Sequence, residues 1–167
     1  KDVLNFITDK SNWIRFKKIC GFREVIEIPG IGQIVSKMDT GNGASSCSLT
    51  YTEATESKDG KTIEWKIGNK TFKHKIIGHS NAEVGDTTHK RPVIELDIKF
   101  AEKLYKKVHV SLVNRTDKST KFLANRNFML QIGCSVNPMK TFVLTSFGDQ
   151  YGAKLAKGEP LAGIIFE

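Results

Sequence analysis

The sequence predicts a mainly β domain, a closed barrel or sandwich of short antiparallel strands, with one short late helix and a helical N-terminal arm. Three observations support this class. From residue 21 to residue 113 apolar side chains recur at about every second position, turn residues separate these runs, and 39% of the 167 residues are hydrophobic, which is enough for one core. We expect the arm at residues 1–20, the β domain at 21–146 and a C-terminal tail at 147–167.

The N-terminal arm is predicted from apolar residues that recur at helical spacing between positions 2 and 19. The polar run Asp9-Lys10-Ser11-Asn12 interrupts them, and Ser11 or Asn12 is a suitable N-cap for a second short helix. The end of the C-terminal tail is also apolar. Because large apolar surfaces are rarely left in water, we expect both ends to pack on the domain or on a partner.

The first two strands of the β domain are predicted at residues 22–28 and 31–38. Both stretches are rich in β-branched and aliphatic side chains, and Pro29-Gly30 separates them. Pro and Gly together are a strong turn signal, so the two strands are expected to pair as neighbours.

Two hairpins follow. Residues 62–67 and 70–77 flank Gly68-Asn69, and a glycine at the first position of a two-residue link suits a type II′ turn. Apolar and polar residues alternate at 94–100 and again at 108–112, which predicts a second hairpin with one buried face. Both hairpins are expected to contribute to one core.

The short late helix is predicted at residues 124–132, because Phe128, Met129 and Ile132 would share one face. The apolar and β-branched residues at 140–145 predict a final strand.

The charge of the chain bears on the partners that can be expected. The chain has 26 Lys and Arg against 18 Asp and Glu, a formal charge of +8 that favours anionic neighbours. The basic residues are scattered in short groups without interleaved aromatic residues, so a solvated surface is preferred and a nucleic-acid partner is disfavoured. If the net charge did drive binding to nucleic acid, the affinity would fall steeply as the salt concentration rises.

The location of the protein is predicted from three absences. No apolar run is long enough to span a membrane, so no membrane partner is expected, and the N-terminus lacks the pattern of a signal peptide. Cys20, Cys47 and Cys134 are far apart and odd in number, which argues against a disulfide framework or a cysteine-rich zinc site. We expect a reducing compartment, either the cytoplasm or a virion.

The motif Asp39-Thr40-Gly41 directly follows the second predicted strand. Two carboxyls at hydrogen-bond distance cannot both ionise, so one can serve as an acid while the other activates water as a base. Gly permits close approach of the backbone, and the Thr hydroxyl can lock neighbouring loops by hydrogen bonds. The alternative is structural, since an Asp in a turn commonly caps its own backbone.

Several segments resemble the retropepsin-like aspartic proteases, most closely the ATP-dependent zinc protease family of bacteria and tailed phages. The resemblance covers about two thirds of the chain. Its motifs are Gly21-Phe22-Arg23-Glu24, Lys37-Met38-Asp39-Thr40-Gly41, Arg91-Pro92-Val93-Ile94-Glu95-Leu96, Val113-Asn114-Arg115 and Leu123-Ala124-Asn125-Arg126.

The resemblance implies a retropepsin-like fold and a homodimer, with Asp39 as the catalytic carboxylate, Thr40 and Gly41 as its supports, and a second Asp39 from the other copy. It further implies that the segment Leu123-Ala124-Asn125-Arg126 packs behind the active-site loop. Asn125 stands where this family usually has Gly, and Asn42 stands where Ala commonly follows the motif.

The resemblance also implies a flap that closes over a bound peptide. The segment from 78 to 89 contains Gly78, Ser80 and Gly85 and is polar, which is typical of a mobile loop. An ordinary long hairpin loop explains the same composition equally well.

The histidines and cysteines give no metal site. His74, His79, His89 and His109 lie on different predicted strands or loops without zinc-ligand spacing, and no cofactor is expected. Cys47 lies among serines, but no His or Asn partner for a nucleophile is identifiable, so a buried strand cysteine is the preferred interpretation.

These observations lead to two hypotheses of function. The first is a homodimeric, retropepsin-like aspartic endopeptidase that processes phage or bacterial proteins, with peptide or protein substrates and a second copy of itself as partners. The alternative is a catalytically silent structural or interaction module of a phage particle, built on the same fold, whose partners are virion neighbours. The two asparagine departures, the terminal extensions and the basic surplus motivate the alternative.

Overall fold

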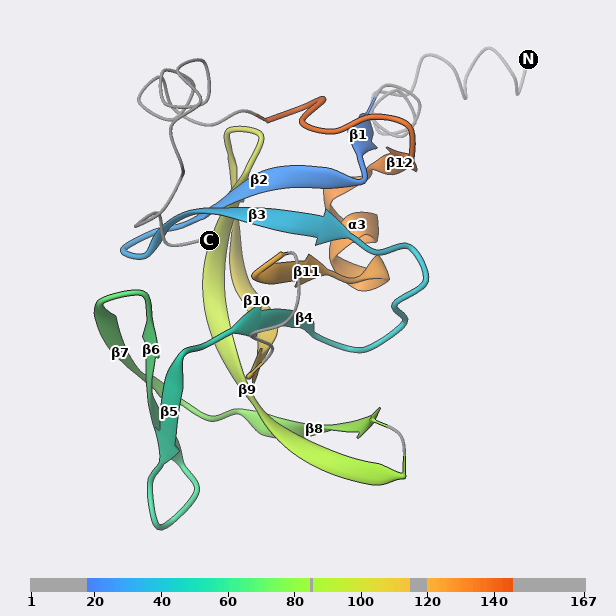
Figure 1. Cartoon of the computed structure of the whole chain (residues 1–167). Coiled ribbons are helices and arrows are strands. Elements are labelled where there is room, and N and C mark those ends of the chain that lie inside the picture. The colour runs from blue at the N-terminus through green and yellow to red at the C-terminus, as the bar shows by residue number, and fades with distance from the viewer. Residues whose placement is uncertain (1–17, 85, 115–119, 146–167) are drawn as a thin grey trace, which may run out of the picture.

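The computed structural model describes residues 18–84, 86–114 and 120–145, and their fold is mainly β with a single helix among them (Figure 1). This confirms the predicted class. The elements in chain order are β1 (Ile19–Gly21), β2 (Arg23–Ile28), β3 (Gly32–Met38), β4 (Cys47–Thr50), β5 (Glu53–Glu56), β6 (Thr62–Ile67), β7 (Lys70–Lys75), β8 (Gly78–Val84), β9 (Thr87–Phe100), β10 (Lys103–Val113), β11 (Phe122–Ala124), α3 (Arg126–Ile132) and β12 (Ser135–Asn137).

The predicted arm and tail lie almost entirely outside the described residues. Ile19 and Cys20, at the end of the predicted helical arm, belong to strand β1. Within the described ranges, no helix has the length and apolar character needed to cross a membrane.

The main sheet has seven strands in the order β10-β4-β11-β3-β2-β9-β8, and β10 also pairs with β9. That additional pairing closes the strands from β10 to β9 into a barrel, while β8 extends beyond it as a further strand. The pairs β10–β4 and β11–β3 are parallel, which the expectation of antiparallel strands did not include.

The barrel is filled by side chains that alternate along its strands, as period-two patterning requires. Several of the fully buried large residues come from different barrel strands, which makes one continuous core. They include Ile26, Ile34, Leu49, Ile94, Ile98, Leu112 and Phe122.

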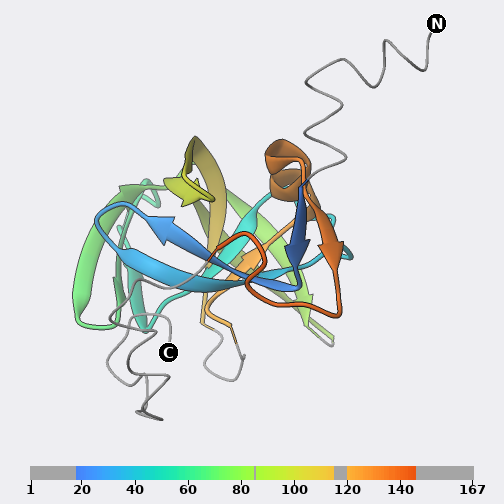
Figure 2. The same ribbon diagram turned by 90° about the horizontal axis from the view of Figure 1, so that it is seen from above.

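The hairpin predicted around Gly68-Asn69 is present as β6 and β7, and β5 completes a separate three-stranded sheet. Gly68 has φ 56°, the positive value that the first central residue of a type II′ turn needs. In Figures 1 and 2 this sheet lies at the opposite end of the molecule from α3 and the β1–β12 pair.

A buried polar contact joins β6 and β7. Trp65 is fully buried, and its indole Nε1–H donates to Nδ1 of His74 at 2.9 Å. An accepting Nδ1 requires the neutral imidazole. Burial also lowers the pKa of His74, because desolvation disfavours the charged ring.

We therefore expect the domain to be less stable in mild acid, through His74. The folded-state pKa of His74 lies below the ordinary value of 6.5. The contribution of neutral His74 to the free energy of unfolding is therefore complete above pH 6.5, and it is lost as the pH falls through the lowered folded-state pKa. Urea unfolding at about pH 7.5 and about pH 5 measures the slope of the free energy of unfolding against pH. His74→Gln should flatten it, and the same change at the exposed strand residue His89 should not; equal slopes in both variants would contradict this assignment.

The second predicted hairpin is formed by β9 and β10, with Ala101 and Glu102 at its turn. The segment from 78 to 89, expected to be a loop, is instead a paired hairpin: β8 runs antiparallel to β9 from Gly78 opposite Val93 to Val84 opposite Thr87. Its polar residues are therefore compatible with strand pairing.

Two predicted elements differ in the structure. The predicted helix at 124–132 begins only at Arg126, because Ala124 pairs in β11 and Asn125 is the N-cap. The strand predicted at 140–145 is wrong: residues 141–144 form bends, and Phe142 has a positive φ of 52°. The backbone N–H groups of residues 143–145 donate to the buried carboxylate of Glu24 instead of to a strand partner.

Candidate functional site

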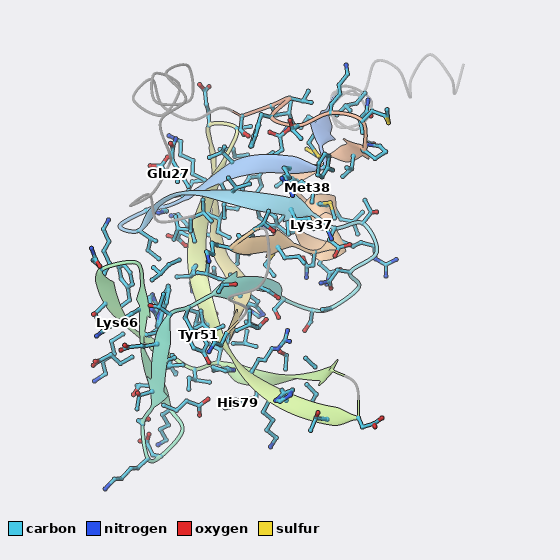
Figure 3. All side chains as sticks on the ribbon, in the orientation of Figure 1. Glu27, Lys37, Met38, Tyr51, Lys66 and His79 are labelled. Atoms are coloured by element: carbon cyan, nitrogen blue, oxygen red, sulfur yellow. The ribbon has the colours of Figure 1, made fainter. Side chains whose placement is uncertain are left out.

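Asp39 lies at the point where β3 leaves the barrel. β11 runs parallel to the end of β3, with Ala124 opposite Met38. The next backbone N–H, from Asp39, donates to the carbonyl of Ala124 at 3.0 Å. Figure 3 labels Lys37 and Met38, which mark this end of β3. The strand pairing therefore fixes the backbone of Asp39, whereas the residues after it leave the sheet.

The Asp39 carboxylate is half-buried and organises a tight turn. Its Oδ1 accepts the backbone N–H of Gly41 at 3.1 Å, and its backbone carbonyl accepts the N–H of Asn42 at 3.2 Å. Thr40 and Gly41 are exposed. One carboxylate oxygen is thus oriented by the backbone on an open loop, an arrangement that serves either a turn cap or a catalytic acid.

Asn125 connects this loop to α3. Its side chain is buried, its Oδ1 accepts the N–H of Phe128 at 2.9 Å as a helix cap, and its Nδ2 donates to the carbonyl of Ala44 at 2.7 Å. The Cys47 thiol also lies 3.6 Å from the same Oδ1. A glycine at this position could make none of these side-chain contacts, so Asn125 has a structural role in this chain.

The other predicted support residues also meet the loop. The backbone N–H of Arg126 donates to the carbonyl of Asn42 at 2.9 Å. Leu123 lies in β11 between Lys37 of β3 and Ser48 of β4. The segment Leu123-Ala124-Asn125-Arg126 therefore contacts the loop that follows β3, through hydrogen bonds from or to Ala124, Asn125 and Arg126.

Two glycines of the loop, Gly41 and Gly43, differ in the space available for a side chain. A Cβ on Gly41 would be 3.5 Å from Asp39 Oδ1, an ordinary contact, so the space around Gly41 does not require glycine there. A Cβ on Gly43 would be 2.5 Å from the guanidinium of Arg126. Sequence reasoning missed Gly43, whose absence of a side chain makes room for Arg126.

The predicted flap residues lie on a separate element. Gly78 and Ser80 are in β8, whereas Gly85 is outside the described residues. His79, labelled in Figure 3, has its Nε2 3.2 Å from Glu56 Oε1 of β5. In Figures 1 and 2 the β8–β9 hairpin and the Asp39 loop project toward the same side of the barrel.

Metal ligands do not cluster in the ranges that the structure describes, where no group of three or more His, Cys, Asp or Glu residues could hold an ion. His74 contacts Trp65, and His109 is an exposed residue 4.0 Å from Glu95. Cys47 is a buried β4 residue, which confirms the prediction of a strand cysteine in the core.

Glu24 is a buried carboxylate that sequence reasoning did not single out. Its Oε1 accepts N–H groups from Gly21 at 2.9 Å, Val143 at 2.8 Å and Leu144 at 3.1 Å. Its Oε2 accepts the backbone N–H of Thr145 at 3.1 Å and the Thr145 hydroxyl. The sequence signal for the burial of Glu24 was the alternation in β2, which places Glu24 on the same face as Ile26 and Ile28.

The chain has a structural likeness among solved structures, whereas its sequence gives no match to known families. Neither a scan against protein-family models nor a search of curated proteins gives a match. Among solved structures, the chain is similar to a protein with unknown function (DUF785) from Legionella pneumophila subsp. pneumophila str. Philadelphia 1, with 26% sequence identity and a TM-score of 0.62. The alignment covers 77% of this chain and 99% of that chain, so the likeness extends over nearly all of that protein.

Proposed function

We propose that this chain is a retropepsin-like aspartic endopeptidase whose active site is completed by Asp39 of a second copy. The observation that carries the proposal is the Asp39 carboxylate, held by the Gly41 N–H on an exposed loop directly after a barrel strand. The loop residues Thr40 and Gly41 are exposed and hence accessible to another copy. The resemblance of the surrounding motifs to retropepsin-like proteases supports the same assignment.

The reaction requires one ionised and one protonated carboxyl. A water molecule between the two Asp39 side chains loses a proton to the ionised carboxylate and attacks the carbonyl carbon of the peptide. The protonated partner donates its proton to the carbonyl oxygen. When the tetrahedral diol collapses, the C–N bond breaks, and the carboxyl that took the proton from water gives it to the leaving nitrogen. A diol hydroxyl returns its proton to the other carboxylate, which restores the dyad.

Substrate binding is assigned to the β8–β9 hairpin. It projects to the same side as the Asp39 loop and carries Gly78 and Ser80 on β8, which is the last strand of the sheet order. An outer strand has backbone groups available to pair with an extended peptide. The expected substrate is therefore an extended peptide segment, and the resemblance points to a phage or bacterial protein as its source.

The test is peptide cleavage by the purified full chain and by Asp39→Asn. Asparagine keeps an oxygen that can accept from Gly41 but cannot exchange the proton, so cleavage of a mixed peptide library between about pH 4 and 7 should fall to background. Asp59→Asn is the matched control, because Asp59 is also a turn carboxylate, accepting from the Lys61 N–H at 3.1 Å. Unchanged cleavage by Asp39→Asn would falsify the proposal.

A second candidate is a catalytically silent structural module of a phage particle. It is favoured by the Asp39–Gly41 hydrogen bond, which alone accounts for an Asp in a turn, and by Asn125, which uses the support position for a helix cap. Under this alternative the wild-type protein cleaves no peptide at any pH, and Asp39→Asn assembles as the wild type does in analytical ultracentrifugation.

A further inference from the structure

A small cavity lies on the outer side of the barrel, next to β2. Its volume is about 220 Å³. Sites for drug-sized molecules usually measure about 300–1,000 Å³, so this cavity suits a metabolite no larger than an amino acid. Its polar and charged lining residues are Glu27, Gln33, Lys99, Glu102 and Thr145.

The cavity forms where two different segments border one edge of β2. β3 pairs along the other edge, whereas β9 pairs with β2 at Glu27, near the end of the strand. Closer to the start of β2 the segment 142–145 borders the same edge, and the Val25 N–H donates to the Thr145 hydroxyl at 2.7 Å. The hollow lies between β9 and this segment, with Thr145 in its wall.

A row of polar residues crosses three strands at the cavity. Glu27, labelled in Figure 3, lies directly opposite Gln33 of β3 and Lys99 of β9. The residues that precede Glu27 and Lys99 in their strands, Ile26 and Ile98, are buried in the core. Because successive side chains of a strand point to opposite faces, the polar row faces outward, where the cavity lies.

The β9–β10 turn brings a second glutamate to the cavity. Ala101 and Glu102 form its two-residue link, with φ values of 46° and 69°. Both values lie in the left-handed region, where Gly, Asn and Asp are the usual residues of such a turn. Non-glycine residues held in this unfavourable conformation are typical of binding sites and active sites, and Glu102 lines the cavity.

The charged residues of the cavity do not neutralise one another. Among the ion pairs formed within residues 18–84, 86–114 and 120–145, none includes Glu27, Lys99 or Glu102. Two carboxylates and one ammonium group are therefore available to a ligand, and their charges leave an excess of one negative charge. A complementary ligand carries two cationic groups and one carboxylate.

We propose that this cavity binds a free amino acid with a cationic side chain, such as arginine. The α-carboxylate pairs with the Lys99 ammonium, and the α-ammonium and guanidinium groups pair with the carboxylates of Glu27 and Glu102. An acidic amino acid adds a further negative charge, and a neutral one leaves one carboxylate without a partner. Both should therefore bind more weakly than arginine.

The cavity is separate from the Asp39 loop. Gln33 lies near the start of β3, and Asp39 follows the end of that strand. At about 3.3 Å per residue, about 20 Å of strand separates them. The proposal therefore does not depend on the proposed peptidase activity, and its test measures binding alone.

The experiment is isothermal titration calorimetry of the full chain with L-arginine at low ionic strength. We expect saturable binding with a dissociation constant below about 1 mM. Agmatine lacks the α-carboxylate and N-acetyl-L-arginine lacks the α-ammonium, so each should bind about tenfold more weakly than arginine. The absence of saturable binding, or equal binding of L-arginine and L-glutamate, would overturn the proposal.

Three variants assign the groups of the ligand to their partners. Glu27→Gln and Glu102→Gln should each weaken arginine binding about tenfold. Lys99→Gln should weaken the binding of arginine but not that of agmatine, which has no carboxylate. Glu64→Gln, at an exposed position of β6, is the matched control and should bind arginine as the wild type does. Circular dichroism checks that each variant folds, and arginine binding by the folded Glu27 and Glu102 variants as tight as that of the control would contradict the proposal.

Discussion

Glu24→Ala is expected to destabilise the domain by about 3–4 kcal/mol, because it removes the acceptor of five hydrogen bonds. The Glu24 side chain is fully buried. Its loss leaves N–H groups of Gly21 and the segment 143–145 without their partner, and each buried unpaired donor costs about 1–3 kcal/mol. Part of this cost is recovered where residues such as Val143 can reach water.

The measurement is urea unfolding monitored by circular dichroism. Glu24→Gln should be intermediate, since an amide retains one acceptor oxygen but turns an NH2 group toward the same donors. Glu27→Ala is the matched control in the same strand, where a half-exposed residue should change stability by less than about 0.5 kcal/mol. A Glu24→Ala variant within about 1 kcal/mol of the wild type would show that the segment 143–145 adds little to stability.

The local elements were predictable because their signals are contained in short stretches. Gly68-Asn69 specifies its hairpin turn, and the alternation around Ile94 specifies β9. The parallel pairing of β3 with β11 was not predictable, since it joins segments far apart in the chain that carry no mutual signal. The same holds for the segment at 143–145, whose backbone N–H groups donate to the distant residue Glu24.

The candidate site likewise has one part that the sequence predicts and another that only the folded chain defines. The position of Asp39 at the end of a strand followed from the local pattern, whereas its contacts with the segment at 123–126 join parts of the chain that are far apart in the sequence. The role of Asn125 could not be anticipated, because its partner Ala44 is defined only by the folded loop.

Asn125→Ala is expected to cost about 2–3 kcal/mol of stability and to loosen the Asp39 loop. Loss of the helix cap accounts for about 1 kcal/mol, since the Phe128 N–H loses its acceptor. The remainder comes from the bond to the Ala44 carbonyl and from the void left at a buried position. Asn127→Ala, at an exposed position of the same helix, is the matched control and should be nearly neutral.

The backbone amide exchange of the loop separates the two roles of Asn125. If Asn125 only caps the helix, Asn125→Asp, which keeps the acceptor for Phe128 but loses the Nδ2 donor, should leave the Gly41 amide as protected as in the wild type. If it also holds the loop, both Asn125→Asp and Asn125→Ala should speed hydrogen exchange at Gly41, whose N–H bonds Asp39 Oδ1. We expect the second result, because the Nδ2–Ala44 contact at 2.7 Å joins α3 to the loop that positions the Asp39 carboxylate.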